Sequence, residues 1–247
     1  MSPDLATNLV NLAIWNGVFL LLGVTGALVA KQHFRPRWLL AALVLFNLNI
    51  VIVLNIFGQN SLIYHLVGDP DVTYNWAGKG LAILVTCAVL ASGRLPLAEA
   101  GVTLRQARKA WIGWTVIAVL CLIEIGLALN IPDEPQTVET FAFQLTIPSL
   151  DEELLYRGVM LYCLVRAFGE GPRALWANFG IAALISTLMF TMVHSLFWTG
   201  DSIGFSMEAF LFTSFCGFVL AWLRLNTGSV VAPIFMHSAI NTLWRVF

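Results

Sequence analysis

Eight long apolar segments dominate this chain, and each has about the length that a helix needs to cross a membrane. They span residues 8–30, 38–58, 76–93, 110–130, 149–168, 175–198, 205–225 and 229–247. A transmembrane helix takes about 20 mostly apolar residues. Because 59% of the residues are hydrophobic and only 11% are charged, an ordinary soluble fold is excluded. We therefore predict an all-α, polytopic integral membrane protein with about eight transmembrane helices in one bundle, forming a single membrane domain over residues 1–247.

The connections between these segments alternate in charge. Basic residues gather in the connections 31–37, 94–109 and 166–173, whereas the opposite connections contain acidic residues and no Lys or Arg. Since Lys and Arg are enriched on the cytoplasmic side of a membrane, both termini are predicted to lie on the non-cytoplasmic side. The net charge of −1 and the absence of a basic stripe argue against nucleic-acid binding. Membrane lipid is therefore an expected partner.

Three carboxylates and one guanidinium interrupt the fifth apolar segment. They belong to Asp151, Glu152, Glu153 and Arg157. A charge at the bilayer centre costs at least about 2.5 to 3.5 kcal/mol, so these groups require an explanation. On a helix, Glu153 and Arg157 are four residues apart and share a face, while Glu152 points about 100° away. We expect the arginine to hold Glu153 and to leave Glu152 free.

Two simpler interpretations compete with a functional site at this position. The charged residues could form a salt bridge that fixes the packing of membrane helices. Alternatively, Ser149 and Glu152 have the spacing of a capping box, so a helix could begin at Ser149. The cap would account for one glutamate and would leave Glu153 and Arg157 unexplained.

Two further motifs place polar residues in apolar segments with the same four-residue spacing. Phe190 precedes His194, and His237 precedes Asn241, so that His237 and Asn241 share a helix face and could both donate to one acceptor. A single histidine in a membrane helix is often a packing residue. Three such polar sites in three segments favour one shared cavity. Counted at about 1.5 Å per residue from the cytoplasmic end, Glu152 lies about 21 Å deep, Asn241 about 18 Å, His194 about 28 Å and His237 about 12 Å.

Other polar residues in the apolar segments have local explanations. Lys79 begins the third segment and is expected to extend to the outer interface. Asn47, Asn49 and Asn55 are expected to form hydrogen bonds between helices. Glu124 lies deep in the fourth segment, where it could pair with Arg157, join the site or contact another helix.

The three motifs Glu152-Glu153-x-x-x-Arg157, Phe190-x-x-x-His194 and His237-x-x-x-Asn241 together resemble the motif set of the CAAX-protease and bacteriocin-processing family of intramembrane glutamic endopeptidases. This resemblance covers residues 152–241. It implies an enzyme of a bacterial inner or plasma membrane that cleaves a membrane-associated or lipidated peptide or protein without a cofactor. It also implies that residues 136–247 form the catalytic core helices, preceded by N-terminal helices in 1–135.

The resemblance also implies roles for individual residues. Glu152 and His194 would activate a water molecule, and His237 and Asn241 would stabilise the oxyanion. Glu153 and Arg157 would support the site. Losing one preorganised oxyanion donor typically lowers the rate about 100- to 1000-fold.

Three other functions compete with this interpretation. Two His and two Glu could bind Zn²⁺, but no H-E-x-x-H motif is present and Arg157 would oppose a nearby cation, so we predict no metal. A proton-coupled transporter would also place Glu, His and Arg in the membrane, although such proteins often show internal repeats that this sequence lacks. A noncatalytic immunity or scaffold protein need not keep every catalytic group.

Overall fold

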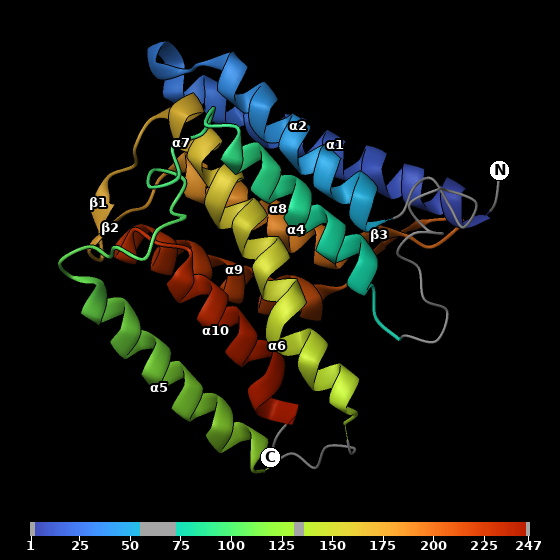
Figure 1. Cartoon of the computed structure of the whole chain (residues 1–247). Helices are drawn as coiled ribbons and strands as arrows, with labels where there is room; N and C mark the ends of the chain where they lie inside the picture. Colours follow the sequence, from blue (N-terminus) through green and yellow to red (C-terminus); the bar gives the residue numbers. More distant parts are fainter. Residues whose placement is uncertain (1–2, 55–72, 131–135, 246–247) are drawn as a thin grey trace.

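The computed structural model describes residues 3–54, 73–130 and 136–245, and most of these residues are helical (Figure 1). The α-helices are α1 (Pro3–Ala30), α2 (Pro36–Val53), α4 (Trp76–Ala91), α5 (Ala110–Ala128), α6 (Val138–Glu152), α7 (Leu161–Phe168), α8 (Ile181–Ser195), α9 (Met207–Thr227) and α10 (Val231–Thr242). A π-helix, η2 (Glu153–Met160), joins α6 to α7, and short 3-10 helices occupy Lys31–His33 and Leu243–Arg245. The expected all-α class is confirmed.

Four of the described helices are long and apolar enough to cross a membrane. They are Leu5–His33, Pro36–Val53, Ala110–Ala128 and Met207–Thr227. Two shorter apolar helices, Trp76–Ala91 and Ile181–Ser195, accompany them. The length and composition of these helices indicate an integral membrane protein. The count of about eight transmembrane helices stays a prediction.

The helix that carries the charged motif begins earlier than predicted. Thr137 caps α6 by accepting a hydrogen bond from the backbone N–H of Thr140, and the helical run then continues to Phe168. Ser149 lies inside this run, where its hydroxyl contacts the carbonyl of Thr146 at 3.0 Å and the hydroxyl of Ser238 at 2.7 Å. The prediction of a capping box at Ser149 was therefore wrong. The helix continues through the interior Pro148, which removes only one backbone hydrogen bond.

The predicted helix over 175–198 was wrong at both ends. Strands β1 (Arg173–Ala174) and β2 (Ala177–Asn178) form a hairpin before α8, and strands β3 (Leu196–Trp198) and β4 (Ile203–Phe205) form another after it. The first hairpin turns at Leu175 and Trp176, whose φ angles are +49° and +59°. This conformation is rare for residues other than glycine. Side chains of α9 hold the turn, because Trp222 and Asn226 donate to its two carbonyls.

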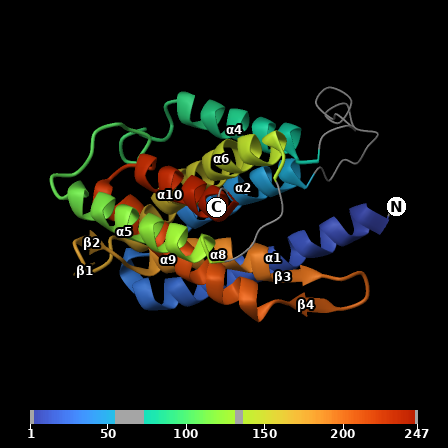
Figure 2. The same ribbon diagram turned by 90° about the horizontal axis from the view of Figure 1, so that it is seen from below.

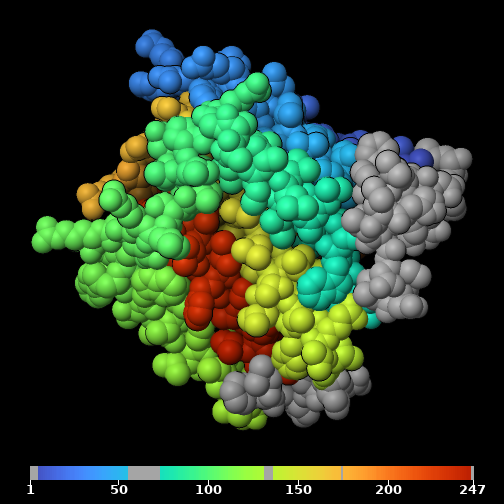
Figure 3. Space-filling view, viewed as in Figure 1, coloured from blue at the N-terminus to red at the C-terminus, as the bar shows by residue number. Residues whose placement is uncertain are grey.

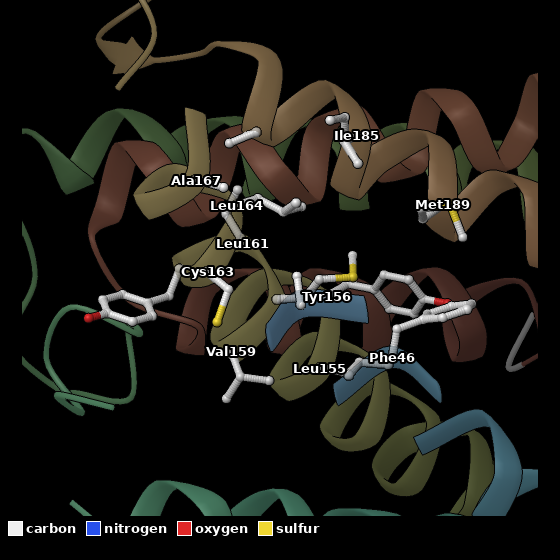
Figure 4. Packing of buried hydrophobic residues seen from close by; sticks show 14 of the residues in the cluster. Phe46, Leu155, Tyr156, Val159, Leu161, Cys163, Leu164, Ala167, Ile185 and Met189 are labelled. Carbon is white, nitrogen blue, oxygen red and sulfur yellow. The ribbon is translucent and has the colours of Figure 1, made fainter. Parts of the chain in front are cut away.

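The π-helix and α7 form the centre of the bundle. All residues of η2 are buried, and Leu155 and Val159 belong to the same hydrophobic cluster as Phe46 of α2 and Met189 of α8 (Figure 4). Another helix contributes to the unusual backbone, since the Ser186 hydroxyl of α8 donates to the carbonyl of Tyr156 at 2.8 Å. A side chain that enters the backbone ladder is a known cause of helix distortion.

The connections of opposite charge lie at opposite ends of the bundle. The β1–β2 hairpin and the connection after α4 lie at one end, and the N-terminus and the β3–β4 hairpin lie at the other (Figure 2). This arrangement agrees with the alternation of charge, whereas the assignment of one end to the cytoplasm stays a prediction. Asn55 and the predicted outer residues Asp69, Asp71, Asp133 and Glu134 lie outside the described residues.

Candidate active site

Glu152 lies where α6 passes into the π-helix, and a lysine from α4 holds one of its carboxylate oxygens. Lys79 Nζ lies 2.8 Å from Glu152 Oε1 and 3.1 Å from Asp151 Oδ2. Asn49 of α2 donates to the other oxygen of Asp151 at 2.7 Å. Two predictions were therefore wrong: Lys79 does not extend to the interface, because it turns inward to two carboxylates, and Glu152 is not free.

The second carboxylate oxygen of Glu152 faces two histidines. His194 Nε2 lies 3.8 Å and His237 Nε2 lies 3.9 Å from Glu152 Oε2. This oxygen is buried and has no hydrogen-bond partner among the described residues. The side chain of Glu152 is 14% exposed and that of His194 is 37% exposed, so the group of three is reached from the surface on the His194 side.

The hydrogen bonds of the two histidines determine which nitrogen carries a proton. His194 Nδ1 lies 2.7 Å from the backbone carbonyl of Phe190, which can only accept a hydrogen bond. Nδ1 of His194 is therefore the donor, and in the neutral ring Nε2 is an acceptor that faces Glu152. His237 Nδ1 lies 2.8 Å from Glu153 Oε1, so it donates to that carboxylate.

Glu153 and Arg157 form the ion pair that their spacing predicted. Arg157 Nη1 donates to Glu153 Oε1 at 2.9 Å, and both side chains are fully buried. Arg157 Nη2 donates to the carbonyl of Gly217 on α9 at 3.2 Å. A Cβ added at Gly217 would lie 3.4 Å from this nitrogen and 3.2 Å from the Phe190 ring, so glycine permits the close approach of α9. The arginine therefore connects η2 to α9.

Phe190 packs against three residues of the site and against Tyr156. Its ring lies 4.3 Å from the Arg157 guanidinium carbon and 4.6 Å from the His194 ring centre. It also meets the rings of Tyr156 and His237 edge to face, at 5.4 Å and 6.0 Å. A cation over an aromatic face is attracted by the ring quadrupole, and a packed ring restricts the rotamers of its neighbours. The aromatic residue of the second motif thus fixes the histidine one turn later.

Asn241 is the site residue whose position is least defined by contacts. It lies one turn after His237 on α10, and Figure 3 shows this helix at the surface between α5 and α6. In the part of the chain that the structure describes, no hydrogen bond of the Asn241 side chain is present, while its backbone carbonyl accepts from Arg245 Nε at 3.0 Å. The structure brings Glu152, Glu153, Arg157, His194 and His237 together, and it does not join Asn241 to them by a direct bond.

Three roles were left open for Glu124, and one of them, pairing with Arg157, is not observed. Arg157 makes its ion pair with Glu153, and Glu124 forms no ion pair within residues 3–54, 73–130 and 136–245. No group of three or more His, Cys, Asp or Glu side chains within those same ranges is arranged to hold a metal ion.

The N-terminal helices supply two polar contacts that the sequence motifs did not indicate. Lys79 and Asn49 lie far from the motifs in sequence, and both bind the Asp151–Glu152 pair. The sequence contained one signal for Lys79, a single lysine one turn into an apolar helix, but its proximity to a helix end made an interfacial position the simpler explanation.

Comparison with protein families gives a match over the region that contains all three motifs. Residues 134–243 match the family described as type II CAAX prenyl endopeptidase Rce1-like. Over these residues the chain is similar to the CAAX protease family. The resemblance inferred from the motifs is thereby confirmed, and the CAAX protease family is one of membrane-bound peptide hydrolases. The matched region begins just before α6 and includes all of α10, so Asn49 and Lys79 lie outside it. No curated protein and no solved structure matches the chain.

Proposed function

We propose that this protein is an intramembrane glutamic endopeptidase that hydrolyses a peptide bond in a membrane-associated peptide or protein. The observation that supports this proposal is the convergence of His194 Nε2 and His237 Nε2 on the unpaired oxygen of Glu152, at 3.8 Å and 3.9 Å. Direct N–H···O hydrogen bonds span about 2.7 to 3.2 Å, so these separations are too long for direct bonds. They suit one water molecule that bridges the three groups.

Glu152 and His194 can activate this water because both present acceptors to it. One hydrogen of the water points to Glu152 Oε2 and the other to His194 Nε2, which leaves an oxygen lone pair for the substrate carbonyl. As the new C–O bond forms, the proton passes to the Glu152 carboxylate. When the C–N bond breaks, the same proton moves to the leaving amine. General acid–base catalysis of this kind contributes about 100- to 10,000-fold to a rate.

His237 and Asn241 stabilise the developing oxyanion in this proposal. His237 already donates through Nδ1 to Glu153, so Nε2 can donate as well only in the imidazolium form. The side-chain amide of Asn241, one turn along α10, supplies the second donor.

Glu153, Arg157 and Lys79 position the groups that touch the substrate. Arg157 neutralises Glu153, and Glu153 orients the His237 ring through Nδ1. Lys79 binds Oε1 of Glu152 and so directs Oε2 toward the two histidines. Partners of this type fix the rotamers and the tautomers on which catalysis depends.

Replacing Lys79 by Met is expected to lower kcat about 10- to 100-fold with little change in KM, the loss typical of an outer positioning partner. Without the ammonium group, Glu152 loses its 2.8 Å ion pair and the fixed direction of Oε2. The measurement is the steady-state cleavage rate of the purified variant in lipid vesicles. Lys31→Met serves as the control, because Lys31 is an exposed lysine at the opposite end of the bundle. An unchanged kcat in Lys79→Met would show that the lysine has no part in positioning Glu152.

The proposed reaction is tested with fluorogenic peptides that carry either a prenylated C-terminal cysteine or an apolar membrane segment, offered to the purified protein in vesicles. We expect cleavage of at least one class, and we expect EDTA and 1,10-phenanthroline to leave its rate unchanged. The physical reason is that Glu152 already has the Lys79 ammonium as its cationic partner. Loss of activity on chelation, with recovery on adding Zn²⁺, would refute the metal-independent mechanism. If the protein cleaved neither class of peptide, both substrate classes would be ruled out.

A further inference from the structure

A polar cavity lies at the end of the bundle where the basic connections meet. Its volume is about 790 Å³, within the range of about 300 to 1,000 Å³ that is usual for ligand sites. Its wall contains residues from the connection after α1, the connection between α4 and α5, the end of α7, the β1–β2 hairpin and the end of α9. Arg166 in this wall lies 14 residues after Glu152 on the same helical run, about 21 Å away at about 1.5 Å per residue. The cavity is therefore separate from the proposed active site.

Positive charge dominates the wall of this cavity. The basic side chains that line it are Arg35, Arg108, Lys109, Arg166, Arg173 and Arg224, and the acidic ones are Glu99 and Glu170. Both acidic side chains already have partners. Glu99 lies 3.7 Å from Arg166, and Glu170 accepts a hydrogen bond from Asn178 at 2.9 Å. Among the described residues, Arg35, Arg108, Lys109 and Arg173 form no ion pair, so the wall has a clear excess of unpaired cations.

Arg224 is the most informative of these cations because it is buried. Its side chain belongs to a residue that is only 8% exposed, and Nη2 donates to the backbone carbonyl of Glu99 at 2.7 Å. Its Nε has no hydrogen-bond partner, and no carboxylate pairs with the guanidinium within the described ranges. A buried charge without an opposite charge is costly for a folded protein. An anion in the cavity would remove that cost.

We propose that this cavity binds a phosphate group, carried either by the headgroup of an acidic phospholipid or by a soluble phosphate compound. Guanidinium groups suit phosphate because their planar donors match its oxygens. The wall also offers apolar contacts from Leu161, Val165 and Trp176, which a lipid could use in addition. The cavity lies where α7 and α9 end and α5 begins, so a membrane that follows the helix ends would place its headgroups at this level. The proposal does not depend on the proposed peptidase activity.

The test measures thermal unfolding of the full-length protein in a neutral detergent, with phosphatidylglycerol, phosphatidylcholine or inorganic phosphate added in separate titrations. A ligand that binds only the folded state raises Tm with concentration. We expect phosphatidylglycerol to raise Tm and phosphatidylcholine to leave it unchanged. A rise with inorganic phosphate at the same concentrations would identify a soluble phosphate as the ligand source, and a rise with the lipid alone would identify the headgroup. If neither phosphatidylglycerol nor phosphate raises Tm, the proposal is wrong.

A pair of triple variants separates the cavity from general attraction to negative charge. Arg108→Gln/Lys109→Gln/Arg173→Gln removes three exposed cations from the wall, and we expect it to weaken phosphatidylglycerol binding at least about tenfold. Arg37→Gln/Arg94→Gln/Arg105→Gln makes the same change in net charge with exposed residues outside the wall, and its binding should match that of the unmodified protein. Equal binding by the first triple variant and the unmodified protein, or equal losses in the two triple variants, would overturn the proposal.

Discussion

Glu152→Gln is expected to reduce peptide hydrolysis by about 100- to 10,000-fold, the contribution of a positioned general base. Glutamine keeps the size of the side chain and can still meet Lys79 through its carbonyl oxygen, but its amide group cannot take a proton from water. With the carbonyl oxygen at Lys79, the atom that faces the two histidines at 3.8 Å and 3.9 Å would be the NH₂ group, which donates and cannot accept. The measurement is kcat of the purified variant in vesicles, alongside its Tm.

The matched control for this variant is Glu208→Gln. Glu208 is an exposed carboxylate in the first turn of α9, so its replacement makes the same chemical change away from the site. We expect the control to cleave at the normal rate and His194→Ala to lose activity as Glu152→Gln does. A Glu152→Gln protein that cleaved substrate normally would show that another group activates the water.

Arg157→Met is expected to cost about 3 to 5 kcal/mol in the free energy of unfolding, the usual loss when one partner of a buried ion pair is removed. Both partners are fully buried, and the substitution leaves the Glu153 carboxylate without its cation at 2.9 Å. It also removes the bond to the carbonyl of Gly217 and the contact with the Phe190 ring. Denaturant unfolding of the purified protein in mild detergent measures the change.

The double variant Glu153→Gln/Arg157→Met distinguishes the uncompensated charge from the lost packing. If the unpaired carboxylate causes most of the loss, the double variant will be more stable than Arg157→Met alone, because a neutral amide is cheaper to bury. The exposed control Arg37→Met should change stability by less than about 0.5 kcal/mol, as is usual for surface substitutions. A double variant no more stable than the single one would attribute the loss to the contacts with α9 and Phe190.

The sequence predicted the local relations in the site better than the limits of the helices. Four-residue spacing placed Glu153 beside Arg157, and the three motifs indicated that the histidines lie near the glutamates, as the structure shows. The depth of His194 was too large because its helix was taken to begin at residue 175. With the observed start at Ile181, His194 lies about 20 Å from the helix end, close to the value of about 21 Å for Glu152. The hairpin residues before α8 are mostly apolar, so from the sequence alone they looked like the first turns of that helix.

The contributions of Lys79 and Asn49 could not be predicted from sequence spacing. Asn49 is 102 positions from its partner Asp151, and Lys79 is 73 positions from its partner Glu152. Both partners lie on α6, so these contacts depend on how α2 and α4 pack against α6. A single lysine near a helix end is compatible with an aqueous interface or with a buried partner. Only the arrangement of the helices decides between these two positions.

The π-helix at Glu153–Met160 has a mechanical consequence for the two polar regions of the protein. It joins the segment that ends in Glu152 to the segment that carries Arg166, so it sets the rotation of one about the helix axis relative to the other. Deleting one residue from it would turn everything that follows by about 100°, the angle of one α-helical residue. The carboxylates and the basic wall would then no longer both face their present neighbours. This short stretch therefore fixes the orientation of the carboxylates relative to the basic residues at the other end of the bundle.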